Sequence, residues 1–448
     1  MTNIAEAGMA AVQAVSAQVV GQVLAGKSLD RVLEAQLAAR RDFMPGERSA
    51  VRSISFDTLR HYGLISAQLD ILLAQPASDA PVRHLLLVAL AQLQFSRAAP
   101  HAIVDLAVES AGQMGFVRAK PLVNAVLRSF LRSPEKFQRA RFKNEIARYD
   151  FPRWWLERVK KEHPAAWQNI LLSARQHPPM WLRVNVRRTS AEAYLQLLSA
   201  AGIGAQMRLG NAVLLKTPLP VHELPGFDDG LVSVQDLGAQ LVAGVLAPTA
   251  GMRVLDACAA PGGKACQMLE RADIDLTALD VDGQRLARVA SNLDRLGLRA
   301  DIRTADAAQL RQWWDGKSFE RILLDVPCSG SGVVRRHPDI KWVRRESDIL
   351  SFAKQQRALL DSLWPCLGNG GRLLYATCSI FRAENHQIVE HFVRVRPDAR
   401  LLPISTDSAE EFRYPGQDKS TTLKCIDGQL LPDLVHDGFF YALLEKLG

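Results

Sequence analysis

Two cysteines stand at corresponding places in two different parts of the chain, each just after a short apolar run. Cys328 lies in the segment Asp-Val-Pro-Cys-Ser-Gly-Ser-Gly at 325–332, and Cys378 lies in Tyr-Ala-Thr-Cys-Ser at 375–379. Both apolar runs are typical of strands, and an open α/β sheet binds its ligands at the carboxyl ends of its strands. Two thiols placed there can share one pocket and act as nucleophiles on an electron-poor ring.

The other four cysteines are expected to be unreactive. Free cysteines are most often buried small apolar groups, and we assign that role to Cys266, Cys366 and Cys425. Cys258 lies in a glycine-containing loop and is expected to contribute backbone contacts only. The six cysteines include no Cys-x-x-Cys pair and no histidine at zinc spacing, so we expect reduced thiols and no metal site.

A loop of small residues follows the strand expected at 252–256. It consists of Ala257, Cys258, Ala259, Ala260, Pro261, Gly262, Gly263 and Lys264. Such residues let the backbone approach a ligand closely at the amino end of the next helix. A phosphate-binding P-loop would need glycine at position 258 and serine or threonine at position 265. The dinucleotide fingerprint Gly-x-Gly-x-x-Gly is also missing, so ATP and NAD are disfavoured as ligands.

Three carboxylates follow the next three expected strands. Asp280 ends the second strand about 20 residues after the loop, where an acidic residue commonly binds a ribose diol. Asp306 follows the third strand, where it can accept a hydrogen bond from an exocyclic amine, and Asp325 ends the fourth. One such residue would carry little weight, because aspartate is common in turns. Three of them without a phosphate-binding loop favour a cationic nucleoside, and S-adenosylmethionine (SAM) is the candidate cofactor.

These residues require a sheet whose strands end at one edge. From about residue 240 the chain alternates between strand-like and helix-like segments, which predicts a parallel, doubly wound, Rossmann-like sheet. The expected strands are 252–256, 274–280, 300–304, 319–325, 371–376 and 438–445, and the expected helices are 264–272, 283–296, 346–364 and 384–394.

Two further domains are expected before this sheet. The first has apolar positions at three- and four-residue spacing and is predicted to be an all-helical bundle, with 83–93 as its central helix. A basic segment between Ser133 and Pro152 is interpreted as a linker. It leads into a small α+β module with a strand at 180–190 and a helix at 191–201. The expected domains are therefore 1–140, 141–238 and 239–448.

The composition is that of a globular protein, with 48% hydrophobic and 23% charged residues among 448. The first residues lack the basic flank and apolar block of a secretory signal, and no segment offers the roughly 18 unbroken apolar residues of a membrane span. We therefore expect a cytoplasmic protein with no membrane partner. The net charge of +8 fits either a polyanionic partner or an ordinary basic surface.

Taken together, the motifs resemble the bacterial RNA cytosine-5 methyltransferases of the RsmB (Fmu/Sun) type. The amino-terminal region also resembles the NusB fold, so the resemblance covers nearly the whole chain. Departures from the family pattern at Ala265 and at 380–382 touch no residue expected to do chemistry. The segments that carry the resemblance are 256–264, 325–332, 335–342 and 375–379 for the methyltransferases, and 99–105 and 123–128 for NusB.

The resemblance implies a SAM-dependent methyltransferase that modifies C5 of a cytosine in 16S ribosomal RNA through a covalent bond between a cysteine and C6. It implies that Cys378 is the nucleophile, that Cys328 assists product release, and that Asp325 holds or protonates the ring at N3. A nearby cation, such as Lys264 or the sulfonium, favours the thiolate form of the attacking cysteine. The helical bundle is implied to bind RNA, and we expect the protein to be a monomer.

Basic residues after the fourth strand are candidate RNA contacts. They can neutralise phosphates around the target nucleotide, although a solvated loop also carries such charges. Trp342 can either stack on a base or pack beneath the loop. In the middle module, Arg183 and Asn185 are RNA contacts on the strength of the resemblance alone. The basic residues after the fourth strand are Arg335, Arg336, His337, Lys341, Arg344 and Arg345.

Two other functions stay open at this point. The same chemistry on transfer RNA would make the chain a tRNA cytosine-5 methyltransferase, since only the resemblance of the bundle favours 16S rRNA. A non-catalytic, NusB-like RNA-binding assembly factor would bind RNA without SAM. The presence of Asp280, Asp306, Asp325 and both cysteines argues against that reading, because a protein without catalysis need not keep them.

Overall fold

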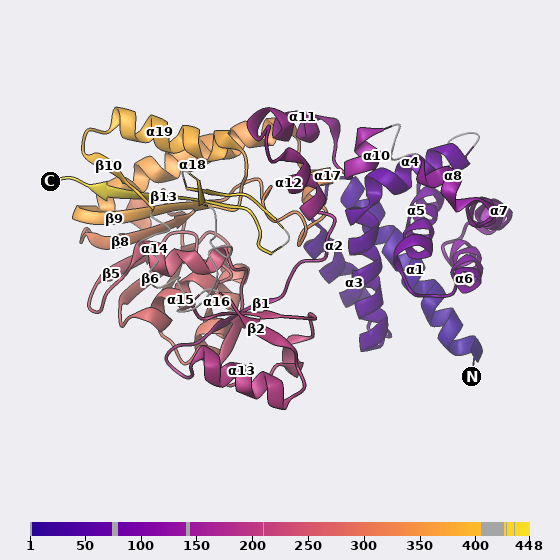
Figure 1. Cartoon of the computed structure of the whole chain (residues 1–448), viewed down its shortest axis with the longest axis horizontal. Coiled ribbons are helices and arrows are strands. Elements are labelled where there is room, and N and C mark those ends of the chain that lie inside the picture. The colour runs from indigo at the N-terminus through magenta and orange to yellow at the C-terminus, as the bar shows by residue number, and fades with distance from the viewer. Residues whose placement is uncertain are drawn as a thin grey trace. The chain divides into compact units, whose positions relative to one another are not determined.

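The structure is a computed structural model, shown in Figure 1, and it describes residues 2–73, 79–139, 144–208, 210–404, 425–426, 428–433 and 435–448. The chain forms two compact units. The first comprises Met1–His177 and Val334–Glu346, and the second comprises Pro178–Val333 and Ser347–Gly448. The domain boundary expected at residue 140 lies inside the first unit. The segment 334–346, expected in the catalytic domain, belongs to the unit of the amino-terminal helices.

The described part of the first unit is helical, as the spacing of its apolar residues predicted. Helix α5 is the central helix predicted at 83–93, since every residue from Leu85 to Gln92 is buried. Its apolar side chains share one core with those of α1, α3, α6 and α7. The helices are α1 (Thr2–Leu24), α2 (Leu29–Ala39), α3 (Pro45–Arg60), α4 (Tyr62–Leu72), α5 (Ala80–Phe95), α6 (Pro100–Gln113), α7 (Lys120–Arg132), α8 (Pro134–Gln138), α10 (Glu145–Tyr149), α11 (Arg153–Glu162), α12 (Trp167–Ser173) and α17 (Ile340–Val343).

The segment between residues 133 and 152 is not the linker that its basic composition suggested. Among its described residues, α8 and α10 are helical, and Asp150 follows α10 in a left-handed conformation with φ of 61°. The buried carboxylate of Asp150 accepts a 2.8 Å hydrogen bond from the amide of Leu64 and lies 3.2 Å from Nε of Arg175. Charged residues here have partners inside the fold, which composition alone does not reveal.

A four-stranded antiparallel sheet with one helix forms the middle module, as predicted. Helix α13 (Ala191–Ala200) packs on one face of the sheet, where Leu182 and Val184 share a core with Tyr194. Trp181 and Arg183 alternate with them and therefore point from the opposite face. The strand order is β2-β3-β1-β4, with β1 (Trp181–Val184), β2 (Ala205–Met207), β3 (Ala212–Leu215) and β4 (Val232–Val234).

The predicted parallel sheet is present in the second unit. Strands β9, β8, β5, β6 and β7 lie side by side in that order and run parallel, so their carboxyl ends meet at one edge. Strand β13 (Phe439–Lys446) pairs antiparallel with β9. Strand β9 begins at Leu367, before the start at residue 371 that the sequence predicted. The parallel strands are β5 (Arg253–Asp256), β6 (Asp275–Asp280), β7 (Asp301–Thr304), β8 (Phe319–Asp325) and β9 (Leu367–Thr377).

Helices cover both faces of this sheet (Figure 1). Helices α14 (Val242–Leu246), α15 (Gly263–Arg271) and α16 (Gly283–Leu296) share a core with one face. Helices α18 (Glu346–Leu363) and α19 (His386–Val395) share a core with the other. The neighbouring residues Leu373 and Leu374 of β9 belong to opposite cores, as the alternation of a strand requires. The sheet is therefore doubly wound, as predicted.

Three short strands were not predicted. They are β10 (Ala399–Leu402), β11 (Cys425–Ile426) and β12 (Gln429–Leu430), and they complete the sheet around β13. Strands this short show no apolar period in the sequence. The side chain of Cys425, expected to be buried, lies outside the described residues. No described helix is long and apolar enough to cross a membrane.

Candidate active site

The two cysteines meet at the carboxyl ends of β8 and β9. Their Sγ atoms lie 3.3 Å apart, within hydrogen-bond distance for sulfur, although 50 residues separate them in the chain. Asp325 and Ala376 are register partners in the two neighbouring strands. Beyond the strands, the amide of Gly332 donates a 2.8 Å hydrogen bond to the carbonyl of Cys378 and keeps the two loops together. The structure thus brings both thiols into one place.

The two thiols do not have equal environments. The hydrogen bond with Cys378 and then burial raise the pKa of the Cys328 thiol well above its usual value. Cys328 therefore keeps its proton at neutral pH. Only a thiolate is a good nucleophile, so Cys328 is the poorer candidate nucleophile of the two.

A partly buried ion pair lies at the same edge of the sheet as the cysteines. Nζ of Lys264, in the first turn of α15, lies 2.5 Å from Oδ2 of Asp325 at the end of β8. Burial acts to lower the pKa of Lys264, but the charge of Asp325 and its hydrogen bond outweigh burial, so the pKa is raised. Negative charge on Cys378 acts in the same direction. Lys264 is thus a fixed cation that attracts a thiolate at Cys378.

The loop from Ala257 to Lys264 turns closely over the ends of the strands. Gly262 caps α15 with φ of 98°, and a Cβ there would lie 3.1 Å from Cα of Val289 in α16. Glycine is therefore required at this position by both the backbone conformation and the close approach of α16. The carbonyl of Pro261 accepts a 3.0 Å hydrogen bond from Asn292, which fixes the turn from the side of α16.

The predicted carboxylates lie at the same edge of the sheet but differ in exposure. Asp280 is buried, and its Oδ2 accepts a 3.2 Å hydrogen bond from the amide of Ala260 in the loop. Asp306 is exposed just beyond β7, and its Oδ1 accepts a 2.9 Å hydrogen bond from the amide of Ala308. Asp325 is engaged with Lys264 as described. The backbone of the loop and these acids lie at the edge of the sheet where an open α/β sheet binds its ligands.

Asp256, the last residue of β5, is a fourth carboxylate that sequence reasoning passed over. Burial, with the negative charge of Asp325 added, raises its pKa to about 7. Neither of its buried oxygens accepts a hydrogen bond of good geometry in the described part of the chain. Its place at a strand end is the same signal that identified Asp280 and Asp325, so the sequence offered the clue.

A buried carboxyl beneath the two cysteine loops was also missed. Glu384 accepts hydrogen bonds from Ser329 and Ser379, the residues that follow Cys328 and Cys378. Its position in a segment expected to begin a helix gave no signal of this role, because the contact depends on the path of both loops.

Two of the basic residues predicted to contact RNA phosphates are buried in the first unit, which corrects that prediction. Lys341 is 0% exposed and Arg335 is 2% exposed. Nζ of Lys341 donates a 2.8 Å hydrogen bond to the carbonyl of Arg60 at the end of α3, and Arg60 donates a 3.0 Å hydrogen bond to the carbonyl of Arg335. These two hydrogen bonds, from the side chains of Lys341 and Arg60, hold the segment 334–346 on the helices.

Of the other residues in this segment, Trp342 packs on the helices, whereas His337 and Arg336 are partly exposed. Trp342 takes the packing role, since its Nε1 donates a 2.8 Å hydrogen bond to the carbonyl of Leu59 and its ring meets that of Tyr62 edge-on. His337 remains partly exposed and lies 3.8 Å from Asp30. Arg336 is half-buried.

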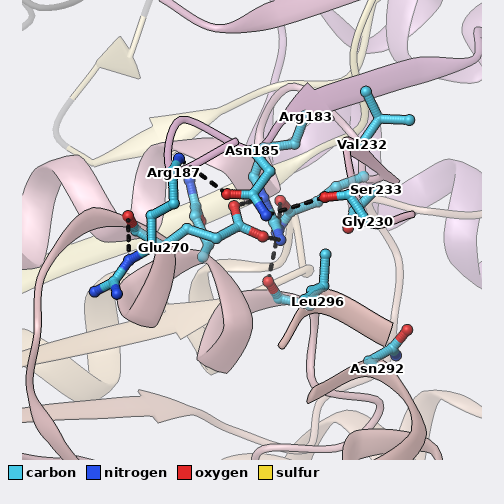
Figure 2. Close-up of polar contacts among 12 residues, drawn as sticks. Arg183, Asn185, Arg187, Gly230, Val232, Ser233, Glu270, Asn292 and Leu296 are labelled. Atoms are coloured by element: carbon cyan, nitrogen blue, oxygen red, sulfur yellow. Dashed lines mark hydrogen bonds and ion pairs between the residues drawn. The ribbon is translucent and has the colours of Figure 1, made fainter. Parts of the chain in front are cut away.

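Arg183, the third predicted RNA contact that the structure corrects, is buried between the middle module and α15. Figure 2 shows Arg183 beside Glu270, with Asn185 and Arg187 of the same strand region around them. Nε and Nη2 of Arg183 contact the two carboxylate oxygens of Glu270 at 2.8 and 2.7 Å. Nη1 donates a 2.7 Å hydrogen bond to the carbonyl of Gly263. Arg183 therefore supports the glycine loop from behind. Asn185 is also buried and bonds the carbonyl of Gly230.

No group of three or more His, Cys, Asp or Glu side chains is placed to hold a metal ion among the residues that the structure describes.

Comparison with known proteins gives matches along the whole chain. Family models match in three consecutive parts: the NusB family at residues 7–132, an RsmF/B-like ferredoxin-like domain at 151–222, and 16S rRNA methyltransferase RsmB/F at 243–445. The chain is 41% identical to ribosomal RNA small subunit methyltransferase B of Vibrio cholerae, over 97% of both chains. It is 40% identical to the protein of the same name from Serratia proteamaculans, over 97% of this chain and 98% of that one.

Solved structures share the fold. The crystal structure of PH0851 matches with a TM-score of 0.75 and 24% identity over 97% of this chain and 99% of that one. A methyltransferase homolog protein from Pyrococcus horikoshii matches with a TM-score of 0.55 and 26% identity, over 67% of this chain and 97% of that one.

Proposed function

The chain belongs to the RsmB/F family of 16S rRNA methyltransferases, and from that membership we propose that it transfers the methyl group of SAM to C5 of a cytosine in 16S rRNA. The observation that carries the proposal is the pair of thiols 3.3 Å apart, next to the Lys264–Asp325 ion pair. A site with one protonated thiol, one nucleophilic thiol and a fixed cation suits covalent attack on a pyrimidine ring.

The residues around the glycine loop fit SAM. The loop offers a tight turn free of bulky side chains, and Asp280, which accepts a hydrogen bond from the loop amide of Ala260, is proposed to hold the ribose diol. In the described part of the chain the buried oxygens of Asp256 lack a good hydrogen-bond partner, and its pKa of about 7 leaves the group partly protonated at neutral pH, so a cation bound nearby would favour its charged form. Bound SAM would supply an electrophilic methyl group carried on a sulfonium. In this proposal Asp306 accepts from the exocyclic amine of the adenine.

Cytosine C5 is a weak nucleophile, so the protein must first activate the ring. We assign the attack on C6 to the thiolate of Cys378, which forms a C6–S bond and makes C5 an enamine carbon able to take the methyl group. Asp325 is proposed to hold the ring at N3. Removal of the proton from C5 then lets the C6–S bond break, which returns the electron pair to sulfur and restores the aromatic ring.

The two cysteines are proposed to divide this work. Lys264 attracts the thiolate of Cys378 and so favours its attack on C6. Cys328 holds its proton at neutral pH and is proposed to assist the release of the methylated product. The raised pKa of Cys328 makes it a poor competitor for the attack, which supports the assignment of the nucleophile to Cys378.

Bisulfite sequencing of total RNA tests the substrate. The source organism and a strain lacking the gene are compared, and the proposal expects one 16S rRNA cytosine to lose its protection from bisulfite conversion in the deletion strain. Loss of protection in a transfer RNA instead would establish the tRNA methyltransferase that stayed open above. No change at any cytosine would contradict the proposed chemistry. Action on 16S rRNA would place the protein in the cytoplasm.

A further inference from the structure

Glu384 is a carboxylic acid enclosed entirely by protein. It lies in the 3-10 turn Arg382–Glu384 between β9 and α19, and its exposed fraction is 0%. Among the described residues its carboxyl group is held by hydrogen bonds from serine, glutamine and backbone donors rather than by a cation. Burial of an acid without a counter-charge costs free energy unless hydrogen bonds compensate, so the hydrogen-bond partners of Glu384 show what the group does.

The first set of partners belongs to the loop of Cys328. The amide of Ser329 donates a 2.7 Å hydrogen bond to Oε1 of Glu384, and the hydroxyl of Ser329 donates a 2.6 Å hydrogen bond to Oε2. Gln356 adds a second link, because its Nε2 contacts both Oε1 of Glu384 and the carbonyl of Pro327. The residues on both sides of Cys328 are therefore tied to Glu384.

The second set belongs to the loop of Cys378. The hydroxyl of Ser379 donates a 2.6 Å hydrogen bond to Oε2 of Glu384, the same oxygen that Ser329 uses. Ser331 lies 3.0 Å from the Ser379 hydroxyl and accepts a 2.9 Å hydrogen bond from the amide of Ile380, so it joins the loops a second time. One carboxyl group thus fixes the residue after each cysteine.

The backbone of Glu384 is itself anchored from the sheet. The hydroxyl of Tyr375 in β9 donates a 2.6 Å hydrogen bond to the carbonyl of Glu384. The neighbouring Asn385 accepts from Thr377 and donates to the carbonyl of Ser379. The carboxyl group therefore sits on a rigid support and can set the positions of the two loops.

We propose that Glu384 is the positioning residue that sets the spacing of Cys328 and Cys378, and through that spacing the step in which Cys328 assists release of the product. The proposal rests on the proposed function for the step, while the spacing itself is a property of the protein alone. Glu384 touches neither the RNA nor the cofactor in this scheme. If Glu384 only stabilised the core, its replacement would lower the stability of the protein without a selective effect on the release of the methylated RNA.

The first test needs no substrate. Diamide oxidises two neighbouring thiols to a disulfide, taking up their two electrons and two protons as it becomes the hydrazine. Mass spectrometry then follows the formation of the Cys328–Cys378 disulfide in the native protein and in three variants. We expect Glu384→Ala to slow this reaction by about tenfold, because the loops lose their shared acceptor. Glu384→Gln keeps an acceptor oxygen for the Ser329 amide and should fall between the two.

The matched control is Val389→Ala in α19. Val389 is buried in the core on the α19 side of the sheet and belongs to neither cysteine loop, so we expect its truncation to lower the melting temperature without altering the spacing of the thiols. We expect its disulfide to form at the native rate. Equal rates in Glu384→Ala and the native protein would overturn the proposal, as would an equal slowing in Val389→Ala.

The second test uses RNA and the release step. In RNA that carries 5-fluorocytosine at the target, the C5 fluorine cannot leave as a proton does, so the native protein should be trapped as a covalent adduct. On ordinary RNA, we expect Glu384→Ala to accumulate adduct and to lose about 10²-fold in kcat with little change in KM for SAM. Cys328→Ala should accumulate the same adduct.

The double variant Glu384→Ala/Cys328→Ala separates the possibilities. If Glu384 acts through Cys328, the double variant releases product no more slowly than Cys328→Ala alone. If the double variant instead releases product more slowly than Cys328→Ala by the factor that Glu384→Ala shows alone, Glu384 does not act through Cys328. Failure of the native protein to form an adduct on fluorinated RNA would count against the proposed function and leave the disulfide result to decide the spacing.

Discussion

Nζ of Lys341 donates a 2.8 Å hydrogen bond to the carbonyl of Arg60, across 281 residues of sequence. This contact holds the segment 334–346, which directly follows the loop of Cys328 in the chain, within the unit of amino-terminal helices. The helical unit is therefore more than a separate module, because it folds together with a piece of chain inserted from the catalytic part. Removal of residues 1–177 would leave a buried lysine and Trp342 without their partners.

The roles of the two cysteines lead to opposite results for the two alanine variants. Cys378→Ala should abolish methyl transfer and covalent adduct formation, while calorimetry should still detect SAM binding, because the loop at 257–264 is untouched. Cys328→Ala should form the adduct but release it slowly, giving a protein–RNA band on a denaturing gel. Turnover by Cys378→Ala would contradict the assignment of the nucleophile.

Lys264 is expected to act through its charge. Lys264→Met removes the cation that attracts the thiolate of Cys378, and it leaves the partly buried carboxylate of Asp325 without its ion-pair partner. We expect kcat to fall by about 10²-fold and the alkylation of Cys378 by iodoacetamide to slow at pH 7. Lys264→Arg keeps the positive charge and should keep more of both rates. Equal losses in the two variants would show that side-chain shape matters rather than charge.

Arg183 is expected to stabilise the protein rather than bind RNA. Arg183→Met leaves Glu270 as a buried, uncompensated charge, which typically costs about 3–5 kcal/mol. Thermal unfolding should show the loss, and the double variant Arg183→Met/Glu270→Leu should recover most of it. SAM binding should weaken because the support of the Gly263 carbonyl is gone. The salt dependence of RNA binding should not change, since no phosphate contact is removed.

Lys341 gives the stability of the first unit a specific dependence on pH. Burial lowers its pKa from an ordinary 10.5 to about 7. Below pH 7 the folded and unfolded states both hold the proton, so its contribution is constant. Between pH 7 and 10.5 the unfolded state holds one proton more, so the free energy of unfolding rises by about 1.4 kcal/mol per pH unit from this group.

Urea unfolding of the native protein and of Lys341→Met measures this effect. The native protein should gain stability relative to the variant as the pH rises from 7 to 9, and the two curves should run parallel between pH 5 and 6. Lys354→Met, at an exposed position of α18, is the control and should follow the native protein throughout. A constant difference between native protein and Lys341→Met from pH 5 to 9 would contradict the lowered pKa.

Much of this protein was predictable from local patterns. The strand ends at Asp256, Asp280 and Asp325 and the two cysteine motifs follow apolar runs, and parallel strands bring their carboxyl ends to one edge whatever lies between them. The paired glycines of the loop at 257–264 likewise predicted a tight turn of the backbone, and Gly262 adopts φ of 98° there. The helical bundle, the parallel sheet and the meeting of the strand-end residues therefore followed from residue type and spacing, while the NusB-like character of the bundle came from the resemblance.

Only the tertiary structure decided what the charged residues do. Arg183 and Lys341 are basic residues of the kind that contact RNA phosphates. Their actual partners, Glu270 and Arg60, lie 87 and 281 residues away in the chain, so no local sequence pattern could predict these pairs. The same holds for Glu384, whose acid group is useful because two loops 50 residues apart converge on it. An exposed charged residue can bind an outside partner such as RNA, whereas a buried one needs a partner inside the protein. The fold determines which residue that partner is.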